Sequence, residues 1–234
     1  MSAAAAVAGG AGDAGSGALA DALARLASDG LVAFPTETVW GLAAVAAREG
    51  ALARLRAWKG RAEDQPLSLL VPDAESLAAI GAELPAAARA LVERFWPGPL
   101  TLVLRCRARF PGGVARADGA VGFRCSPHPA AAALARAAFA AGLGPVTATS
   151  LNRSGEPPAR TRAEAAALCA GAARGADAPA LLAGHWPDAG GGAASTVVDV
   201  TGSEPRVLRE GALPAGSVFD VASASPCAGE ARRP

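Results

Sequence analysis

Three residues whose types are otherwise missing from this chain lie in two short polar segments. Among 22 lysine and arginine residues there is one lysine, Lys59, and the chain has one glutamine, Gln65, and one asparagine, Asn152. The segments are KGRAEDQ at 59–65 and TSLNRSG at 149–155. In a sequence so rich in Ala, Gly, Arg and Pro, these three residues are retained either by chance or because their chemistry is required.

The two segments carry the groups that bind phosphate. Lys59 supplies a compact charge, and Arg61 supplies a planar fork that matches phosphate oxygens. Ser150 and Asn152 follow a buried strand, and ligands of open α/β sheets bind at the carboxyl ends of strands. A third segment, PTETVWGL at 35–42, also leaves a strand and carries hydroxyls. Because the chain contains no G-x-x-x-x-G-K-[ST] motif, these features predict a polyphosphate or nucleotide site built without a P-loop.

Positive charge gathers in two stretches, although the formal net charge is only +1. Five cationic residues lie within 48–61 beside one glutamate, and five arginines lie within 105–124 beside one aspartate. They are either scattered surface arginines or the two sides of one anion-binding cleft. The aromatic content of 4% argues against stacking platforms for single-stranded nucleic acid.

Helical and strand patterns alternate along the chain. Helices are predicted over 18–29, 49–58, 73–80, 85–95, 129–141 and 162–173. The last of these begins with the capping box formed by Thr161 and Glu164. Strands are predicted over 31–34, 67–71, 101–105, 120–124, 145–150, 195–200 and 206–210. The pattern predicts one α/β domain with a mixed sheet over 18–220, between disordered tails at 1–17 and 221–234.

Other classes of protein are not expected. The most alanine-rich stretch, 129–143, is too short for a membrane span and contains Arg136. The N-terminus lacks the basic and leucine-rich parts of a signal peptide, so a cytoplasmic protein is expected. The four cysteines form no CxxC pair and are expected to be reduced and inert, with zinc binding as the remaining alternative. The histidines, His128 and His185, are interpreted as structural residues.

Seven blocks of the sequence, taken in order, resemble the YrdC domain of the threonylcarbamoyl-AMP synthase family. The blocks are PTETVWGL, KGRAEDQPLSLLV, WPGPLTLVL, AVGFRCSPHP, TATSLNRSG, STVVDV and VLREGA. They extend from about residue 18 to residue 214 and match the short, single-domain type. The resemblance implies a twisted, open mixed sheet with flanking helices and a basic concave face. It also implies a nucleotidyltransferase that makes threonylcarbamoyl-AMP and pyrophosphate from L-threonine, bicarbonate or CO2, and ATP.

The resemblance also implies a role for each matching residue. Thr38 and Ser195 contact threonine, while Lys59 and Arg61 hold the ATP phosphates and are the catalytic pair. The ATP site is completed by Gln65, Thr101, Ser150, Asn152 and Arg209. Arg124 borders the same face. No metal ligands are implied, and Mg²⁺ is expected to arrive with ATP and to be held mainly by its phosphates.

Two leucines depart from the family pattern. Leu70 stands where some longer relatives have histidine, so threonine would be held differently. Leu151 occupies the middle of the usual S-A-N and is expected to narrow the pocket. Glu37 is either a general base or a structural carboxylate. Lys59, in a polar turn beside Gly60, is expected to be exposed in the free protein.

The implied partners are a threonylcarbamoyl transferase complex that modifies adenosine 37 of tRNA, together with weak tRNA binding by the chain itself. Two other functions compete with this reading. One is a non-catalytic RNA-binding module in tRNA or ribosome maturation, which the clustered arginines favour. The other is a carbamoyl-transfer module like that of hydrogenase-maturation proteins, which the lack of an appended zinc-finger or acylphosphatase-like segment disfavours.

Overall fold

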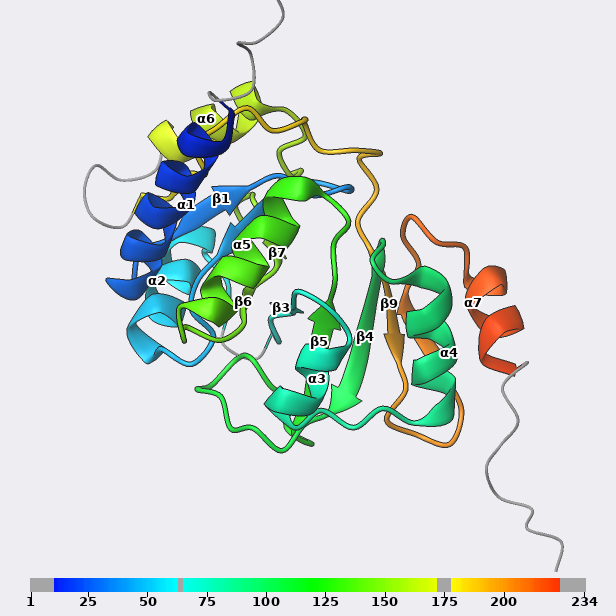
Figure 1. Ribbon diagram of the computed structural model, residues 1–234. Coiled ribbons are helices and arrows are strands. Elements are labelled where there is room, and N and C mark those ends of the chain that lie inside the picture. The colour runs from blue at the N-terminus through cyan, green and yellow to red at the C-terminus, as the bar shows by residue number, and fades with distance from the viewer. Residues whose placement is uncertain (1–10, 63–64, 172–177, 224–234) are drawn as a thin grey trace, which may run out of the picture.

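The computed structural model describes residues 11–62, 65–171 and 178–223, with residues 11–16 described by their backbone alone (Figure 1). The helices are α1 (Ala11–Ala27), α2 (Glu49–Lys59), α3 (Glu75–Ile80), α4 (Ala86–Phe95), α5 (Pro129–Ala140), α6 (Arg162–Gly171) and α7 (Ala215–Ser223). The first five strands are β1 (Val32–Phe34), β2 (Gly41–Ala43), β3 (Leu69–Leu70), β4 (Leu100–Arg105) and β5 (Ala120–Arg124). The others are β6 (Val146–Thr147), β7 (Thr149–Ser150), β8 (Ala180–Leu181), β9 (Thr196–Asp199) and β10 (Arg206–Arg209).

The strands form two mixed sheets within a single domain. One sheet has the order β7-β2-β1-β8, and the other has the order β10-β9-β4-β5-β3-β6. Strand β1 pairs antiparallel with β2 and parallel with β8. In the larger sheet β4 is antiparallel to β5 and parallel to β9. The predicted α/β class with an open mixed sheet is confirmed.

The chain crosses from one sheet to the other at Ala148. Strand β6 pairs with β3 of the six-stranded sheet, whereas β7 pairs with β2 of the four-stranded sheet. The hydroxyl of Thr147 ties the crossing in place, because it accepts from the Ala44 amide at 3.0 Å and donates to the Leu42 carbonyl at 2.9 Å. The single strand predicted over 145–150 is therefore two short strands that serve two sheets.

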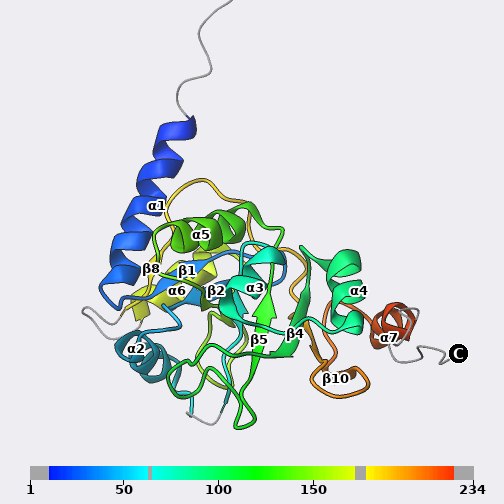
Figure 2. The ribbon, with the colours of Figure 1, turned by 60° about the horizontal axis from the view of Figure 1, so that its bottom comes forward.

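Helices cover the outer faces of both sheets, and α1 and α7 lie at opposite ends of the molecule (Figures 1 and 2). Helices α1 and α5 pack together, and α1 also contacts β1. Leu26 of α1, Phe34 of β1 and Leu134 of α5 belong to one hydrophobic cluster. Helix α7 packs on α4. No described helix has both the length and the apolarity that a membrane crossing requires.

Helix ends follow the local sequence. The side chain of His128 caps α5 by accepting from the Ala130 amide at 3.2 Å, which confirms its structural role. The capping box is also confirmed, since the Glu164 amide donates to Thr161 Oγ1 at 3.2 Å and the Thr161 amide donates to the Glu164 carboxylate at 3.3 Å. Gly60 ends α2 with a φ of 65°, the left-handed conformation that favours glycine.

The predicted boundaries need three corrections. Helix α1 begins at Ala11, so the helix takes in residues 11–17, which were predicted to belong to a disordered tail. Helix α7 was not predicted, and it extends to Ser223, past the predicted domain end at 220. Helix propensity does not explain the N-terminal extension, because residues 11–17 include three glycines. Strands β2 and β8 were not predicted, because each is only two or three residues long. The rest of both predicted tails lies outside the described residues.

Candidate active site

A cavity of about 330 Å³ lies where the two sheets meet. Part of its lining is one face of the six-stranded sheet, because alternate residues of a strand point the same way. These residues are Thr101 and Val103 of β4, and Ala120, Gly122 and Arg124 of β5. The crossing between the sheets supplies Ala148, Thr149 and Ser150. The cavity is thus assembled from segments that are far apart in the sequence.

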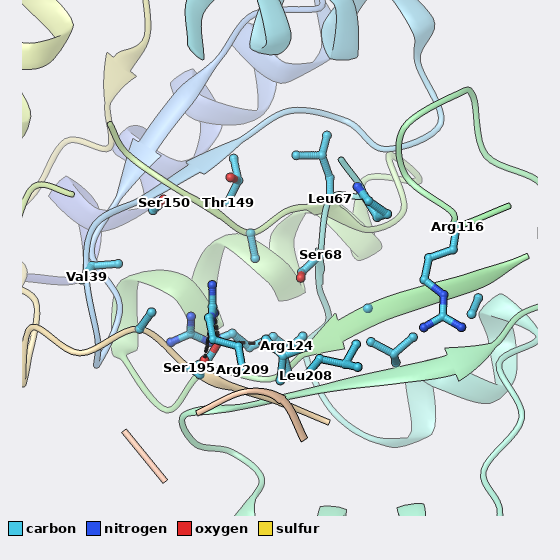
Figure 3. A pocket seen from close by; sticks show the side chains of 18 of the residues that line it. Val39, Leu67, Ser68, Arg116, Arg124, Thr149, Ser150, Ser195, Leu208 and Arg209 are labelled. Carbon is cyan, nitrogen blue, oxygen red and sulfur yellow. Dashed lines mark hydrogen bonds between the residues drawn. The ribbon is translucent and has the colours of Figure 1, made fainter. Parts of the chain in front are cut away.

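Four arginines line this cavity: Arg61, Arg124 and Arg209, and also Arg116, which is paired with carboxylates (Figure 3 labels Arg116, Arg124 and Arg209). Burial, and then the charge of Arg209, lowers the pKa of Arg61. Burial, and then the charge of Arg124, lowers the pKa of Arg209. Arg209 therefore faces repulsion from both Arg61 and Arg124. A bound anion relieves that repulsion, so the cavity is built to receive negative charge.

The guanidinium of Arg124 is held in place by the segment that follows β1. Its Nη2 donates to Thr38 Oγ1 at 2.6 Å and to Glu37 Oε1 at 2.8 Å. The second carboxylate oxygen of Glu37 accepts from the Ser126 hydroxyl. Arg124 is only 6% exposed, and its Nε is a buried donor with no partner among the described residues. The guanidinium of Arg124 is therefore held through Nη2, while its Nε–H remains free to donate to a ligand.

Two hydroxyls meet beside the arginines. Thr101 Oγ1 and Ser195 Oγ are 2.8 Å apart, because parallel pairing of β4 and β9 brings the start of β9 against β4. Arg209 Nη2 donates to the Ser195 carbonyl at 2.8 Å. Figure 3 shows Ser195, Arg209 and Arg124 together at one end of the cavity. The geometry thus brings together cations and hydroxyls from three strands.

Lys59 does not line the cavity and is not exposed. It is 2% exposed, and its ammonium donates to the Ser150 carbonyl, to the Asn152 carbonyl at 3.0 Å and to Asn152 Oδ1 at 2.9 Å. The expectation of an exposed side chain is wrong, because α2 extends to Lys59 and turns it toward the 149–155 loop. Burial, followed by the charge of Arg61, lowers its pKa to about 7. Lys59 therefore holds the 149–155 loop, whose Ser150 lines the cavity, from the side away from the cavity.

The remaining sequence-predicted residues divide between the cavity and its surroundings. The residues that line the cavity are Arg61, Thr101, Ser150, Ser195 and Arg209. Thr38 is 1% exposed and lies behind Arg124. Asn152 braces its own loop, because Oδ1 also accepts from Ser150 Oγ at 2.6 Å and Nδ2 donates to the Glu156 carbonyl at 2.6 Å. Gln65 is exposed beside Arg61, outside the lining.

Neither of the leucines that depart from the family pattern lies in the cavity lining. Leu151 is fully buried in the larger core cluster, and its amide donates to the Trp40 carbonyl at 2.8 Å. Leu70 is fully buried in the second cluster. The expectation that Leu151 narrows the pocket is therefore wrong, since both side chains pack in the hydrophobic interior.

Several residues of the lining were not predicted as site residues, including Ser68 and Arg116. Arg116 lies at the far end of the cavity in Figure 3. It pairs with Asp118 and, at 2.6 Å, with Asp199. Burial alone would raise the pKa of Asp199, but hydrogen bonds from Thr201 and Arg116 lower it to about 2. The ion pair with Asp118 could be expected from the sequence, because the two residues are two positions apart. The contact with Asp199 could not, because that residue is 83 positions away.

The described thiols are poor nucleophiles and poor metal ligands at neutral pH. Burial raises the pKa of both Cys125 and Cys169 to about 11. Burial also raises the pKa of Cys106. Within the part of the chain that the structure describes, no group of His, Cys, Asp and Glu is arranged to hold a metal ion.

These features define an α/β protein with an arginine-lined cavity at the junction of two mixed sheets. The sequence profile of the family described as "Telomere recombination", which groups the Sua5, YciO and YrdC proteins, matches residues 24–211. The chain belongs to this family.

Named relatives are found at moderate identity. The threonylcarbamoyl-AMP synthase of Halorhodospira halophila is 42% identical over 143 residues, which cover 61% of this chain and 73% of that protein. The threonylcarbamoyl-AMP synthase of Bacillus subtilis is 37% identical over 199 residues, which cover 83% of this chain and 54% of that protein. The match therefore accounts for about half the length of the Bacillus protein.

Solved structures share the fold. The crystal structure of Pyrococcus abyssi Sua5 complexed with L-threonine superposes with a TM-score of 0.75 at 34% identity, covering 87% of this chain and 56% of that one. Escherichia coli YciO superposes with a TM-score of 0.70 at 20% identity, covering 86% of this chain and 92% of that one. At that identity, the likeness to YciO shows the fold alone.

Proposed function

We propose that this chain is an L-threonylcarbamoyladenylate synthase, which joins L-threonine, bicarbonate or CO2, and ATP and releases pyrophosphate. The observation that carries the proposal is the cluster of Arg61, Arg124 and Arg209, three cations that line one cavity and of which Arg209 is repelled by the other two. A triphosphate and a carboxylate are anions that suit such a cluster. Relatives that bear this enzyme's name support the choice.

The reaction needs two bond-forming steps. The threonine amine bonds to the carbon of CO2 and loses a proton, which gives a carbamate. A carbamate oxygen then attacks the α-phosphorus of ATP, and the bond from that phosphorus to the bridging oxygen of pyrophosphate breaks. No redox step is involved. The protein's contribution is to hold two anionic substrates in line and to neutralise the charge on the phosphates.

The cavity residues divide this work. Arg61 and Arg209 contact the phosphates, assisted by the hydroxyls of Thr101 and Ser150. The unpartnered Nε of Arg124 and the hydroxyl of Ser195 hold L-threonine. Thr38 acts behind Arg124 rather than on the substrate directly, because its hydroxyl accepts from that guanidinium.

Lys59 serves the phosphate site through the 149–155 loop. All three protons of its ammonium are used on Ser150 and Asn152, so contact with a phosphate requires it to release one of them. Glu37 is engaged by both Arg124 and Ser126, and we assign it to positioning rather than to proton removal.

Magnesium enters this proposal with ATP. Glu37 is bound by Arg124, and Asp118 and Asp199 are bound by Arg116, so these described carboxylates near the cavity already have cationic partners. The chain offers the ion few ligands, and the phosphates would hold it. The protein acts in the cytoplasm in this proposal. The product passes to a threonylcarbamoyl transferase complex that acts on adenosine 37 of tRNA. The chain itself binds tRNA weakly.

The test is pyrophosphate release by the purified full-length chain with ATP, bicarbonate and L-threonine. We expect release to require threonine and a threonylcarbamoyl-AMP mass to appear in the products. Arg209→Gln, which removes a cavity cation, should lower the rate at least tenfold. Arg107→Gln serves as a matched control, because Arg107 is an exposed arginine outside the cavity lining. Salt-sensitive RNA binding without threonine-dependent release would instead favour an RNA-binding module.

A further inference from the structure

Three consecutive glycines, Gly190–Gly192, run along the backbone of Thr36–Thr38. Their amides donate in order to the three carbonyl oxygens of that segment, at 3.2, 3.2 and 3.1 Å. We call Gly190–Gly192 the glycine clasp. Its contacts to 36–38 use backbone atoms only, so the distance between the two backbones decides whether they form.

Glycine is required at one position of the clasp and not at the next. A Cβ at residue 190 would lie 2.2 Å from the Glu37 carbonyl oxygen and 2.9 Å from its carbon. Those are backbone atoms, which cannot rotate aside as a side chain can. A Cβ at Gly191 would meet nothing within 4 Å. Two adjacent glycines thus differ sharply in what an added methyl group would do.

The segment under the clasp holds the cavity arginine. Thr38 and Glu37 accept from Nη2 of Arg124, at 2.6 and 2.8 Å. Displacing the Glu37 backbone moves both acceptors, and with them the guanidinium. Ser195, which follows the clasp in the chain, is fixed independently by Thr101 at 2.8 Å. The clasp therefore acts mainly on Arg124.

We propose that the glycine clasp positions Arg124 for the carboxylate of L-threonine and that Gly190 is a positioning residue for this substrate. The inference rests on the proposed function, in which Arg124 holds threonine. Moving a guanidinium by a fraction of an ångström weakens a charge-assisted hydrogen bond that depends on its geometry. ATP, which uses Arg61 and Arg209, should be affected less.

The kinetic test compares Gly190→Ala with Gly191→Ala. We expect Gly190→Ala to raise KM for threonine at least tenfold, while kcat at saturating threonine and KM for ATP change by less than about threefold. Gly191→Ala should behave like the wild type. Equal threonine KM values in the two variants would overturn the proposal. A loss shared equally by both substrates, with a large fall in Tm, would also overturn it, because that is the result of general destabilisation.

A spectroscopic test keeps this inference separate from the proposed function. The Nε–H resonance of Arg124 can be assigned in ¹⁵N spectra by its disappearance in Arg124→Lys. It should shift in Gly190→Ala and stay in place in Gly191→Ala, whether or not the protein releases pyrophosphate. An unshifted resonance in folded Gly190→Ala would refute the clasp. Failure of threonine-dependent release in the wild type, with the shift present, would refute only the proposed function.

The wild-type protein provides a further test should Gly190→Ala not fold. If the closed clasp is the state in which Arg124 binds threonine, then the ligand stabilises that state. Saturating L-threonine should therefore slow hydrogen exchange at the amides of Gly190–Gly192 at least tenfold. Unchanged exchange, under conditions where threonine supports pyrophosphate release, would contradict the proposal.

Discussion

The ammonium of Lys59 donates to three oxygen atoms that belong to only two residues, Ser150 and Asn152. One tetrahedral nitrogen with three protons can point at three such close acceptors, whereas a planar guanidinium spreads its donors over three nitrogens. The site is also closed, since Lys59 is 2% exposed. This geometry gives a physical reason for the retention of a lysine in a chain that otherwise uses arginine.

Lys59→Arg should therefore impair both activity and stability, despite conserving charge. We expect kcat/KM for ATP to fall at least roughly tenfold, or about 1.4 kcal/mol, because Ser150 moves with its loop. We also expect the free energy of unfolding to fall by about 1–3 kcal/mol, as for other enlarged buried side chains. Steady-state kinetics and urea unfolding measure the two effects. Wild-type values for both would mean that Lys59 is replaceable.

Activity should also depend on pH through Lys59, whose pKa burial and Arg61 lower to about 7. Above that pH the neutral amine keeps two protons for three acceptors, so kcat/KM for ATP should fall as pH rises through about 7. The free energy of unfolding should change in the opposite direction and rise with pH. The unfolded lysine titrates near 10.5, so between about pH 7 and 10.5 the unfolded chain binds more protons and Lys59 makes the fold more stable as pH rises.

The Lys59→Arg variant is the control for this pH dependence, because arginine stays charged across the range. Its profile should be lower overall and should lack the descending limb near pH 7. If the limb persists in the variant, it arises from another group, and the assignment to Lys59 is wrong.

At the scale of elements, the two sheets depend on the crossing at β6 and β7. Thr147 is fully buried, and its hydroxyl satisfies the Ala44 amide and the Leu42 carbonyl. A pair of strands that each hold only two residues has little pairing of its own. The side-chain hydrogen bonds therefore contribute substantially to joining the sheets at the cavity.

Thr147→Val should lower the free energy of unfolding by about 1–3 kcal/mol, because it removes the acceptor of the buried Ala44 amide and a donor to the Leu42 carbonyl. Thr147→Ser, which keeps the hydroxyl, should lose much less. Urea unfolding of both variants measures the difference. Equal stability of Thr147→Val and Thr147→Ser would show that the hydroxyl does not join the sheets.

The elements that were predictable are those with local signals. Strand β5 has the predicted bounds, 120–124, and the caps at His128 and Thr161 mark the starts of α5 and α6. Strands β2 and β8 carry no such signal, because tertiary contacts rather than propensity define them. The cationic residues of the site could be predicted from the sequence, because their side-chain chemistry suits phosphate. The burial of Lys59 behind Ser150 could not, because it depends on a contact between segments about 90 residues apart.

At the scale of the whole molecule, α1 and α7 pack at opposite ends of the domain (Figure 2). Over residues 17–27, where the side chains of α1 are described, Ala18, Ala22 and Leu26 are buried, and Leu26 is fully buried. Ala222, near the end of α7, is 8% exposed and belongs to the larger core cluster. Both terminal helices therefore contribute to the core that supports the cavity.

Graded truncation of the chain should show how much of α1 and α7 the fold and the activity require. A chain of residues 17–223 keeps every buried side chain that the structure describes in both helices, and we expect its pyrophosphate release to match that of the full chain. A chain of residues 28–223 loses Leu26, which alone contributes about 2–3 kcal/mol of burial. Removal of the whole helix also uncovers apolar residues of α5, so Tm should fall by roughly 10 °C or more. Activity lost already in the 17–223 chain would show that the removed ends have a function, and an unchanged Tm in the 28–223 chain would show that α1 is dispensable for stability.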